Sequence, residues 1–460
     1  MENKNPIIQR YYIKGQLQVV SPLVIGSGED ERTDIDLVRD AGGNPFIPGA
    51  ALAGVFRHFT RNHLEDVNGD EHPVIKSLMG KTEKDSTLSL LMISDSILQK
   101  NTACRVTVRD GLELDPSSKT VGTHKTEDGR SGAGAKYDYE VIEPGAVFDL
   151  KMEMIIREKH RDGIDSIYDA LAFLLNALAN GSLSVGAKTR RGFGKIRLEK
   201  ENLRILKLDM QHKPDKEKWI GFDWQDWNFE PNMTLEELTP KILNFEIQPR
   251  FTVSAAFTIP YSILIRHYNV NPAEEDTVQL KSNGKCVIPG TSWNGALRQA
   301  IYSQLHHLTG NETRAKNILK SLFGEVDPQK NKARASRVLI EESIIQNKQE
   351  ISYTRNKVDR FTGGVVESAL FTEKPVYSGT VTLDIILEKP NEWEKGLLLL
   401  GLKDIANSIQ PVGGAANIGR GILQAEYEDI KIDGAPLTQE MEKTCFKALY
   451  DHLKEGETNG

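Results

Sequence analysis

The segment TDIDLVRDAGGNPFIPGAALAGVFRHF (residues 33–59) contains two aspartates, then a Pro-Gly turn, then an apolar spacing typical of a helix. The same order returns in EEDTVQLKSNGKCVIPGTSWNGALRQAI (residues 274–301). The Ile-Pro-Gly of residues 47–49 recurs 241 positions later, and Arg57 recurs as Arg298 at the same spacing. The chain therefore contains an internal repeat, and each copy is expected to form one folding unit.

Three further motifs recur downstream in the same order. RDGLELD (109–115) resembles YTRNKVD (353–359), AKYDYEVIEPG (135–145) resembles ALFTEKPVYSG (369–379), and GAKTRRGFG (186–194) resembles GGAANIGRG (413–421). The spacing between the copies drifts from 244 to 234 and then to 227 positions. Such a drift is expected when loops gain or lose residues, and the first copy carries about ten extra residues between its first two motifs.

Both copies predict the same series of elements. Each begins with a β-like run (11–20 and 250–259) and continues with the helix after the Pro-Gly turn. Strand-like segments follow (88–97 and 335–344), and then a second helix (164–181 and 391–409). A glycine-rich turn and a last strand close each copy (195–200 and 422–430). This β-α-β-β-α-β order predicts an α+β chain of two tandem ferredoxin-like domains.

The domain prediction divides the chain into four parts. The first domain covers residues 1–206 and the second covers residues 245–435. Between them, residues 207–244 contain Trp219, Trp224 and Trp227, so we expect a strap packed on one domain and not a flexible linker. The polar tail, residues 436–460, is expected to be frayed.

The bulk composition limits where the protein works. No apolar run approaches the ~20 residues of a membrane helix, and the N-terminus resembles no signal peptide. The three cysteines suggest neither disulfides nor a zinc site, which favours a cytoplasmic protein without membrane contact. A net charge of −7 argues against a free-standing nucleic-acid binder, although binding needs only a local basic surface.

Residues 26–40, here called the acidic loop, contain the first candidate site. Charge runs are usually solvated, and the spacing is not that of an EF-hand calcium loop. The functional alternative is that Asp34 or Asp36 acts as a general base or positions a metal beside a phosphate. Counted back from the Pro-Gly turn of the second copy, Asp34 aligns with Glu275 and Asp36 with Thr277, with Asp276 between them. The second copy is therefore the weaker candidate.

The two glycine loops, residues 186–194 and 413–421, are candidate anion sites. Glycines allow backbone N–H groups to approach an anion, and cations attract a polyanion, although a plain helix-to-strand turn with surface cations is equally compatible. The candidate residues of the first loop are Gly186, Lys188, Arg190, Arg191, Gly192 and Gly194. Those of the second loop are Gly413, Gly414, Asn417 and Arg420.

The Pro-Gly turns add helix N-termini, which favour phosphate. The first offers Gly49 with backbone only, whereas the second adds the hydroxyls of Thr291 and Ser292. Arg57 and Arg298, about two turns into each helix, either reach a nucleic-acid strand or pair with an acid.

Two segments are expected to protrude. Residues 111–136 are long, polar and rich in glycine, and they contain His124. The counterpart, residues 355–368, is shorter; Arg355 is at its start and Phe361 near its tip. Such a Phe either wedges between bases or packs on its own domain. The chain contains no H-E-x-x-H, P-loop, G-x-S-x-G or Rossmann motif, which disfavours the familiar hydrolases, kinases and dehydrogenases.

These motifs, in this order and present twice, resemble the RAMP superfamily of CRISPR-associated proteins. More narrowly, IGSG…DIDLVRDAGGNPFIPGAALAGVFR and VGAKTRRGFGKIRL resemble the seventh Cas family, the backbone of type III RNA-guided effector complexes. IPGTSWNGALR, VDRFTGG and GGAANIGRG carry the resemblance in the second copy. Two units in one chain are similar to the fused backbone subunits of type III-D-like systems.

The resemblance implies a role in antiviral defence. Each unit would be an RRM-like ferredoxin fold that holds guide RNA, and the protruding hairpins would be thumbs that displace a nucleotide of the complementary target RNA. An aspartate of the acidic loop would then support attack of the adjacent 2′-hydroxyl, making the protein an endoribonuclease dependent on Mg²⁺ or Mn²⁺. By position this aspartate is Asp34, with Asp36 a close rival, and both are the implied metal ligands. Other subunits of the type III complex would be its partners.

The sequence departs from the family at the Pro-Gly turns, which commonly continue Ser-Ser-Leu-Lys. The first copy has Ala50 and Ala51 there, and neither copy has the lysine. Two alternatives stay open. One is a structural RNA-binding backbone subunit without cleavage. The other is a guide-processing ribonuclease, for which His124 would be the only candidate.

Overall fold

The computed structural model describes residues 5–28, 33–66, 70–81, 87–112, 136–238, 242–268, 275–327 and 332–458. The chain divides into two compact units. Unit 1 contains Met1–Val108, Tyr139–Thr189 and Gly194–Gln248, and unit 2 contains Arg109–Asp138, Arg190–Phe193 and Pro249–Gly460. Two short segments of the first copy therefore belong to unit 2, which the repeat did not predict.

The sheet of unit 1 has the strand order of a ferredoxin-like fold. Its strands are β1 (Ile7–Val19), β5 (Leu91–Ile93), β9 (Val147–Arg157), β10 (Leu183–Ser184), β11 (Lys195–Leu198) and β12 (Arg204–Asp209). Neighbouring strands follow the order β10-β11-β1-β9-β5, and β12 also pairs with β1. All these pairings are antiparallel. Strands β11, β1, β9 and β5 are the fourth, first, third and second strands of the predicted order.

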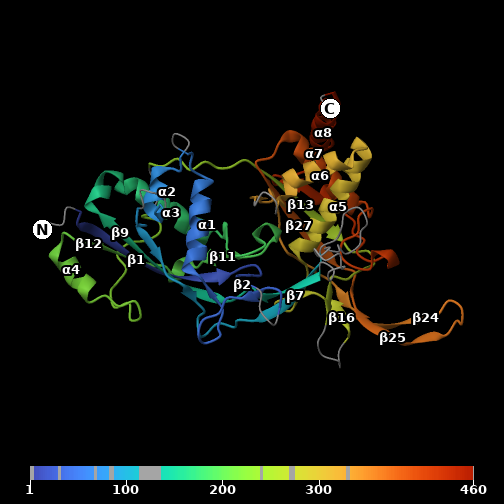
Figure 1. Ribbon diagram of the computed structural model, residues 1–460, viewed down its shortest axis with the longest axis horizontal. Helices are drawn as coiled ribbons and strands as arrows, with labels where there is room; N and C mark the ends of the chain where they lie inside the picture. Colours follow the sequence, from blue (N-terminus) through green and yellow to red (C-terminus); the bar gives the residue numbers. More distant parts are fainter. Residues whose placement is uncertain are drawn as a thin grey trace, which may run out of the picture. The chain divides into compact units, whose positions relative to one another are not determined.

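Helices cover one face of this sheet (Figure 1). They are α1 (Gly49–Arg61), α2 (Pro73–Met79) and α3 (Ile164–Ala179). Phe56 of α1 and Leu171 of α3 share a core with Ile13 and Leu17 of β1. Helices α1 and α3 lie where the periodicity predicts them. Helix α2 was not predicted, because its seven residues are too few for a periodicity to be recognised.

The Trp-rich segment lies against the other face of the same sheet. Because side chains alternate along a strand, Tyr12 points away from the core that contains Ile13. Tyr12 packs instead with Leu206 and Trp227, and its ring stacks on Phe222 with centroids 3.9 Å apart. The segment also includes the short helix α4 (Lys213–Ile220). This part of the chain is therefore a packed element of unit 1.

Unit 2 repeats the architecture. Its main strands are β13 (Arg250–Thr258), β21 (Val338–Ile340), β27 (Thr380–Glu388), β28 (Ile430–Ile432) and β29 (Ala435–Pro436). They follow the order β21-β27-β13-β28-β29. Its helices are α5 (Gly290–Thr309), α6 (Glu312–Phe323), α7 (Glu392–Ala406) and α8 (Gln439–Thr458). Trp293 and Leu297 of α5 share one core with Leu398 of α7 and Phe257 of β13.

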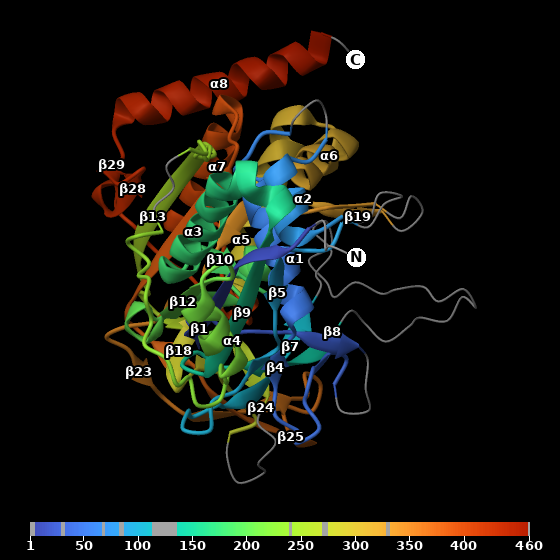
Figure 2. The ribbon, with the colours of Figure 1, turned by 90° about the vertical axis from the view of Figure 1, so that its left-hand side faces the viewer.

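Two predictions for the second copy need correction. Most of the predicted strand at 422–430 is not formed: Gln424 makes isolated bridges to Thr258 and Asn407, and β28, which begins at Ile430, takes the place beside β13. The tail predicted to fray contains α8 instead (Figure 2). Leu449 and Leu453 of α8 are buried in the core of unit 2, which explains why a segment of polar average composition is ordered.

Short strands complete both halves of the chain. In the first copy they are β2 (Gly26–Gly28), β3 (Asp36–Leu37), β4 (Phe46–Ile47), β6 (Ser96–Ile97), β7 (Val106–Leu112) and β8 (Lys136–Ile142). In the second copy, β24 (Tyr353–Val358) and β25 (Val365–Lys374) form a hairpin that projects from unit 2 (Figure 1). Others are β14 (Ser262–Ile263), β15 (Arg266–Tyr268), β16 (Thr277–Gln279), β17 (Lys281–Ser282), β18 (Lys285–Ile288), β19 (Glu325–Asp327), β20 (Lys332–Arg334), β22 (Ser343–Ile344), β23 (Gln349–Glu350) and β26 (Val376–Tyr377).

Candidate functional site

The acidic loop of unit 1 is a short hairpin. Strand β2 pairs with β3, and the backbone N–H of Val38 donates to the carbonyl of Ile25 at 2.9 Å. Asp36 is only 5 % exposed, and its carboxylate accepts a hydrogen bond from the hydroxyl of Thr33. Asp34, two residues earlier, is exposed. The structure therefore separates the two predicted aspartates: Asp36 stabilises the hairpin, and Asp34 is accessible to a large ligand.

The first glycine loop is docked beside the acidic loop. Gly186 has a φ of +88°, and a Cβ on it would overlap the carbonyl oxygen of Val24. The next residue, Ala187, donates its N–H to the same oxygen at 2.8 Å. Gly194 closes the loop with a φ of +78° against Val185. These two glycines are therefore required by the packing of the loop itself.

Tyr139 on β8 joins the two loops. Ile35 pairs with Tyr139 in a parallel bridge, and Glu140 donates its N–H to the Ile35 carbonyl at 3.0 Å. Lys188 has a φ of +58°, and its ammonium group lies 3.4 Å from the centre of the Tyr139 ring. Glu140 also forms an ion pair with Arg39 at 2.8 Å. Three segments that are remote in sequence thus meet at one place, and Asp34 adjoins Ile35 in the chain.

The remaining first-loop candidates lie within unit 2. Arg190 forms an ion pair with Glu388 at 2.6 Å. A Cβ on Gly192 would lie 2.8 Å from the Cα of Glu341, and a Cβ on Gly290 would overlap the carbonyl oxygen of Arg191. The glycine at 192 is therefore needed for close approach to the protein backbone, where the sequence suggested close approach to an anion. The side chain of Arg191 is exposed.

The Pro-Gly turn of unit 1 is already occupied. The N–H of Gly49 donates to the Asp95 carboxylate at 2.8 Å, so this helix terminus is neutralised within the protein. Arg57 forms a bidentate pair with Glu71, with distances of 2.9 and 2.6 Å. Of the two alternatives for Arg57, pairing with an acid is the one observed. In unit 2, Thr291, Ser292 and Arg298 are half-buried on α5.

The acidic segment of unit 2 aligns one residue away from the sequence prediction. Thr277 pairs in parallel with Glu373, as Ile35 pairs with Tyr139. This register makes Asp276, and not Glu275, the counterpart of Asp34. The cause is the loop before the Pro-Gly turn, because Lys281 pairs with Cys286 whereas Arg39 pairs with Pro45, one residue farther along.

Both unit 2 carboxylates are engaged. Asp276 accepts hydrogen bonds from the N–H and hydroxyl of Thr372, at 2.7 and 3.0 Å, and these lower its pKa. Glu275 accepts a hydrogen bond from Ser352 and lies 3.4 Å from the ammonium of Lys374, and the pKa of Glu275 is lowered too, chiefly by Ser352. These contacts hold the two residues before β16 against β25 and against the residue that precedes β24.

The second glycine loop has the backbone of the first with different side chains. Gly413 has a φ of +90°, and Gly414 donates its N–H to the Leu264 carbonyl at 2.9 Å. Arg420, predicted to bind RNA, is 2 % exposed and forms an ion pair with Glu373 at 2.8 Å. Burial lowers the pKa of Arg420, and its role here is structural. Asn417 is exposed on the loop.

Sequence reasoning missed Arg266. This exposed side chain on β15 lies beside the second glycine loop, where a Cβ on Gly414 would be 3.3 Å from its Nε atom. No motif identified it, because it lies outside the repeated glycine pattern. Arg266 supplies an exposed cation beside the second glycine loop, whereas the guanidinium of Arg420 is buried.

The unit 2 hairpin presents an aromatic tip. Phe361 is fully exposed, at 100 %, and the Asp359 carboxylate orders the turn by accepting the N–H groups of Phe361 and Thr362 at 2.9 and 2.8 Å. Arg355 lies over the Tyr353 ring at 5.1 Å and forms an ion pair with Glu373 at 3.3 Å. The alternative in which Phe361 packs down is excluded. His124 lies outside the described residues.

The described carboxylates do not build a resident metal site. No group of three His, Cys, Asp or Glu side chains arranged for a metal occurs within the described ranges. Asp36 is buried beside Thr33, so of the two predicted aspartates Asp34 is the exposed one. The part of the chain described here also contains no helix long and apolar enough to cross a membrane.

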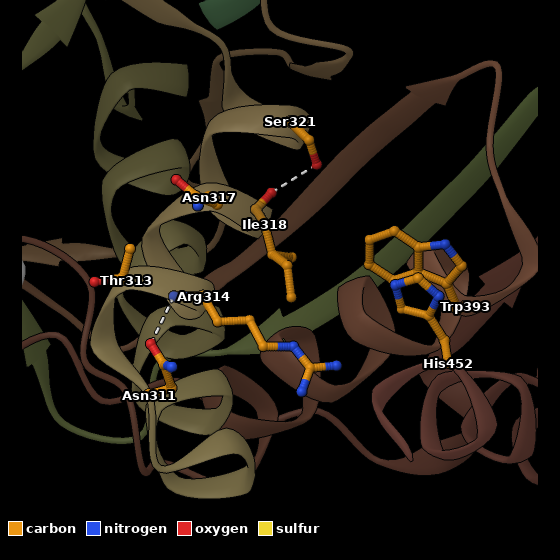
Figure 3. Close-up of a pocket in the computed structure, with 8 residues that line it drawn as sticks. All are labelled: Asn311, Thr313, Arg314, Asn317, Ile318, Ser321, Trp393 and His452. Atoms are coloured by element: carbon orange, nitrogen blue, oxygen red, sulfur yellow. Dashed lines mark hydrogen bonds between the residues drawn. The ribbon is translucent and has the colours of Figure 1, made fainter. Parts of the chain in front are cut away.

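A cavity of about 440 Å³ lies in unit 2 (Figure 3). It is lined by α6 and by the ring pair of Trp393 and His452, whose centroids are 4.1 Å apart. The guanidinium of Arg314 donates to the Leu453 carbonyl at 2.7 Å. None of the predicted site residues lines this cavity.

The comparison with known proteins finds one family in both copies of the repeat. A family model described as the RAMP superfamily matches residues 16–197 and 252–424. The two matched regions coincide with the two repeats and leave out the Trp-rich segment and α8. No curated protein matches the chain.

Proposed function

The chain belongs to the RAMP superfamily as a two-unit protein, and from this premise we propose that it is a backbone subunit of a type III CRISPR effector complex. In this proposal it holds guide CRISPR RNA in the cytoplasm, together with other subunits of the complex. Unit 1 cleaves the complementary target RNA. The proposal depends on one observation. Exposed Asp34 directly precedes Ile35, whose backbone pairs with Tyr139, and the Lys188 ammonium lies over the Tyr139 ring.

RNA binding is proposed to be largely independent of sequence. Glycine loops that present backbone and nearby cations suit phosphates, which carry no base identity. The candidates are the half-buried Lys188 and the exposed Arg191 from the first loop, and the exposed Asn417 and Arg266 in unit 2. Base pairing between guide and target would supply sequence choice, so a chain of net charge −7 can act inside an assembly.

The proposed reaction is attack by a 2′-hydroxyl on the adjacent phosphate. The 2′-O–P bond forms, the P–O5′ bond breaks, and the products are a 2′,3′-cyclic phosphate and a 5′-hydroxyl. Asp34 accepts the proton of the 2′-hydroxyl, and water protonates the leaving 5′-oxygen. DNA lacks the 2′-hydroxyl and is spared. Dependence on Mg²⁺ or Mn²⁺ is also proposed, and loss of cleavage in excess EDTA would support it.

Unit 2 is proposed to be a scaffold and not a second nuclease. Asp276 takes the position of Asp34, and two hydrogen bonds from Thr372 hold its carboxylate against β25. Its hairpin offers an exposed Phe361 as the wedge that displaces a base.

A cleavage map tests these assignments. The complex is assembled with a guide and an end-labelled complementary RNA, and Asp34→Asn, Asp36→Asn and Asp276→Asn are compared with the wild type. We expect Asp34→Asn to slow one cleavage by about 10²–10⁴-fold, the range for loss of a general base. Asp276→Asn should leave every product unchanged.

Guide occupancy and thermal unfolding of each complex serve as controls. Asp36→Asn should lower the unfolding temperature before it lowers cleavage, since Asp36 is buried. If every product persists in the Asp34→Asn complex with full guide occupancy, the nuclease assignment fails and the structural alternative stands.

A further inference from the structure

The two glycine loops have the same backbone at one position that an ordinary residue seldom adopts. Lys188 has a φ of +58°, and Ala415, 227 positions later, has a φ of +61°. The flanking contacts also match: Gly194 donates to Pro22 at 2.7 Å, and Gly421 donates to Ser262 at 2.8 Å. The backbone therefore has the same left-handed conformation at this position in both units, but only unit 1 has a side chain with an ammonium group there.

The partner of this position differs as well. Tyr139 of unit 1 corresponds to Glu373 of unit 2, 234 positions later. In unit 1 the Lys188 ammonium lies 3.4 Å from the Tyr139 ring centre. In unit 2 the Glu373 carboxylate receives Arg420 at 2.8 Å and Arg355 at 3.3 Å. In unit 2 the residue at this position is thus engaged in ion pairs within the protein.

Tyr139 fixes the ammonium relative to the acidic loop. Its backbone pairs with Ile35, the neighbour of Asp34, and the hydrogen bond of this pairing runs from the N–H of Glu140 to the Ile35 carbonyl at 3.0 Å. A cation over the face of an aromatic ring is attracted to it electrostatically, which favours one position of the lysine side chain. The ring therefore restrains a flexible lysine beside the acidic loop.

We propose that Lys188 is a catalytic residue of unit 1 that binds the scissile phosphate, and that Tyr139 is its positioning residue. This inference rests on the proposed nuclease function. As the 2′-O–P bond forms and the P–O5′ bond breaks, negative charge grows on the non-bridging oxygens, and the Lys188 ammonium stabilises that charge. Asp34 still accepts the 2′-proton. Unit 2, with Ala415 in this place, binds RNA without cleaving it.

Single-turnover cleavage with saturating target RNA tests the inference, because saturation removes effects on affinity. We expect Lys188→Met to slow cleavage by about 100-fold, the loss typical of one transition-state donor, with full guide occupancy. Lys188→Arg should retain part of the rate. Tyr139→Phe keeps the ring and should cleave like the wild type, whereas Tyr139→Leu should approach Lys188→Met. Arg197→Gln removes an exposed cation elsewhere in unit 1 and should leave the saturated rate unchanged.

A phosphorothioate at the scissile position gives a readout that a structural role would not alter. Sulfur accepts hydrogen bonds poorly, so one diastereomer should be cleaved slowly by the wild type. Lys188→Met should cleave both diastereomers at the same slow rate. An unchanged sulfur effect in Lys188→Met would overturn the inference, and so would an unchanged saturated rate with weaker binding alone.

The experiment also separates this inference from the proposed function. If Asp34→Asn abolishes cleavage and Lys188→Met does not, only the inference fails. If neither changes cleavage, the nuclease assignment itself fails. If Lys188→Met does not assemble with guide, Lys188→Arg and Tyr139→Leu decide the question by the same rate and sulfur measurements.

Discussion

Trp293 and Leu52 occupy the same position of the two repeats, and this difference changes the bonding of a serine. In unit 2 the Trp293 indole donates to Ser343 at 3.1 Å. Ser96 is its counterpart, because Ile47 pairs with Ser96 as Ile288 pairs with Ser343. With leucine in place of the indole, the buried Ser96 hydroxyl has no hydrogen-bond partner among the described residues.

This comparison predicts opposite responses to one substitution. Ser343→Ala leaves a buried indole N–H without its acceptor and should destabilise unit 2 by about 1–3 kcal/mol. Ser96→Ala removes a polar group that makes no hydrogen bond here and should be neutral or stabilising. Urea unfolding of both variants measures the difference. Equal losses of stability would contradict the assignment.

The sequence placed Asp34 and Asp36 in one loop but did not show which of them is accessible. The burial of Asp36 depends on the pairing of β2 with β3 and on Thr33, and neither follows from charge spacing. The alignment with Glu275 was also wrong by one residue, because it was counted from the Pro-Gly turn across a loop that is shorter in the second copy.

Among the elements, the glycine loops show most directly why glycine occurs where it does. Gly194 and Gly421 both have a positive φ, of +78° and +75°, and a Cβ on either would overlap the carbonyl oxygen of the residue just before its loop, Val185 or Val412. In contrast, Gly54 is exposed within α1, and a Cβ there would meet no atom within 4 Å.

Alanine substitutions should therefore have opposite signs. Gly194→Ala should cost more than about 2 kcal/mol from left-handed strain and overlap, and should detach the first glycine loop. Gly54→Ala should stabilise α1 by about 0.5–1 kcal/mol. Denaturant unfolding and amide hydrogen exchange of residues 186–194 provide the test. Full protection of the loop in Gly194→Ala would refute this reading.

Helices with clear periodicity were predictable, whereas short elements were not. α1, α3, α5 and α7 follow their apolar spacing. The unpredicted α2 and α6 occur between the Pro-Gly helix and the next strand in each copy. The predicted strand at 422–430 failed because pairing with β13, which sequence alone does not reveal, is made by β28 instead.

At the scale of the whole molecule, helix α8 contributes to the core of unit 2. Helix α8 crosses α7 closely, since a Cβ on Gly396 would overlap the carbonyl oxygen of Cys445. The composition of residues 436–460 is polar on average, which suggested a loose tail. An average does not reveal the few apolar residues that α8 buries. The repeat and the ferredoxin-like plan were predictable, but the assignment of residues 109–138 and 190–193 to unit 2 was not, because it depends on contacts between distant segments.

Two adjacent residues of α8 test this placement. Leu449 is buried and Tyr450 is 57 % exposed. Leu449→Ala should destabilise unit 2 by about 2–5 kcal/mol, as core truncations do. Tyr450→Ala should change stability by less than about 1 kcal/mol. Calorimetry of the full chain compares them, and similar losses from both would mean that α8 does not pack as described.

The Trp-rich segment on the sheet of unit 1 also gives the protein an optical reporter. Three of its five tryptophans, at 219, 224 and 227, lie in this one segment. Indole emission shifts to longer wavelength when the ring enters water, and Trp227 is only 5 % exposed. Intrinsic fluorescence of the full chain is therefore weighted toward this segment. A red shift that precedes the loss of circular dichroism would mean that the segment leaves the sheet before either unit unfolds.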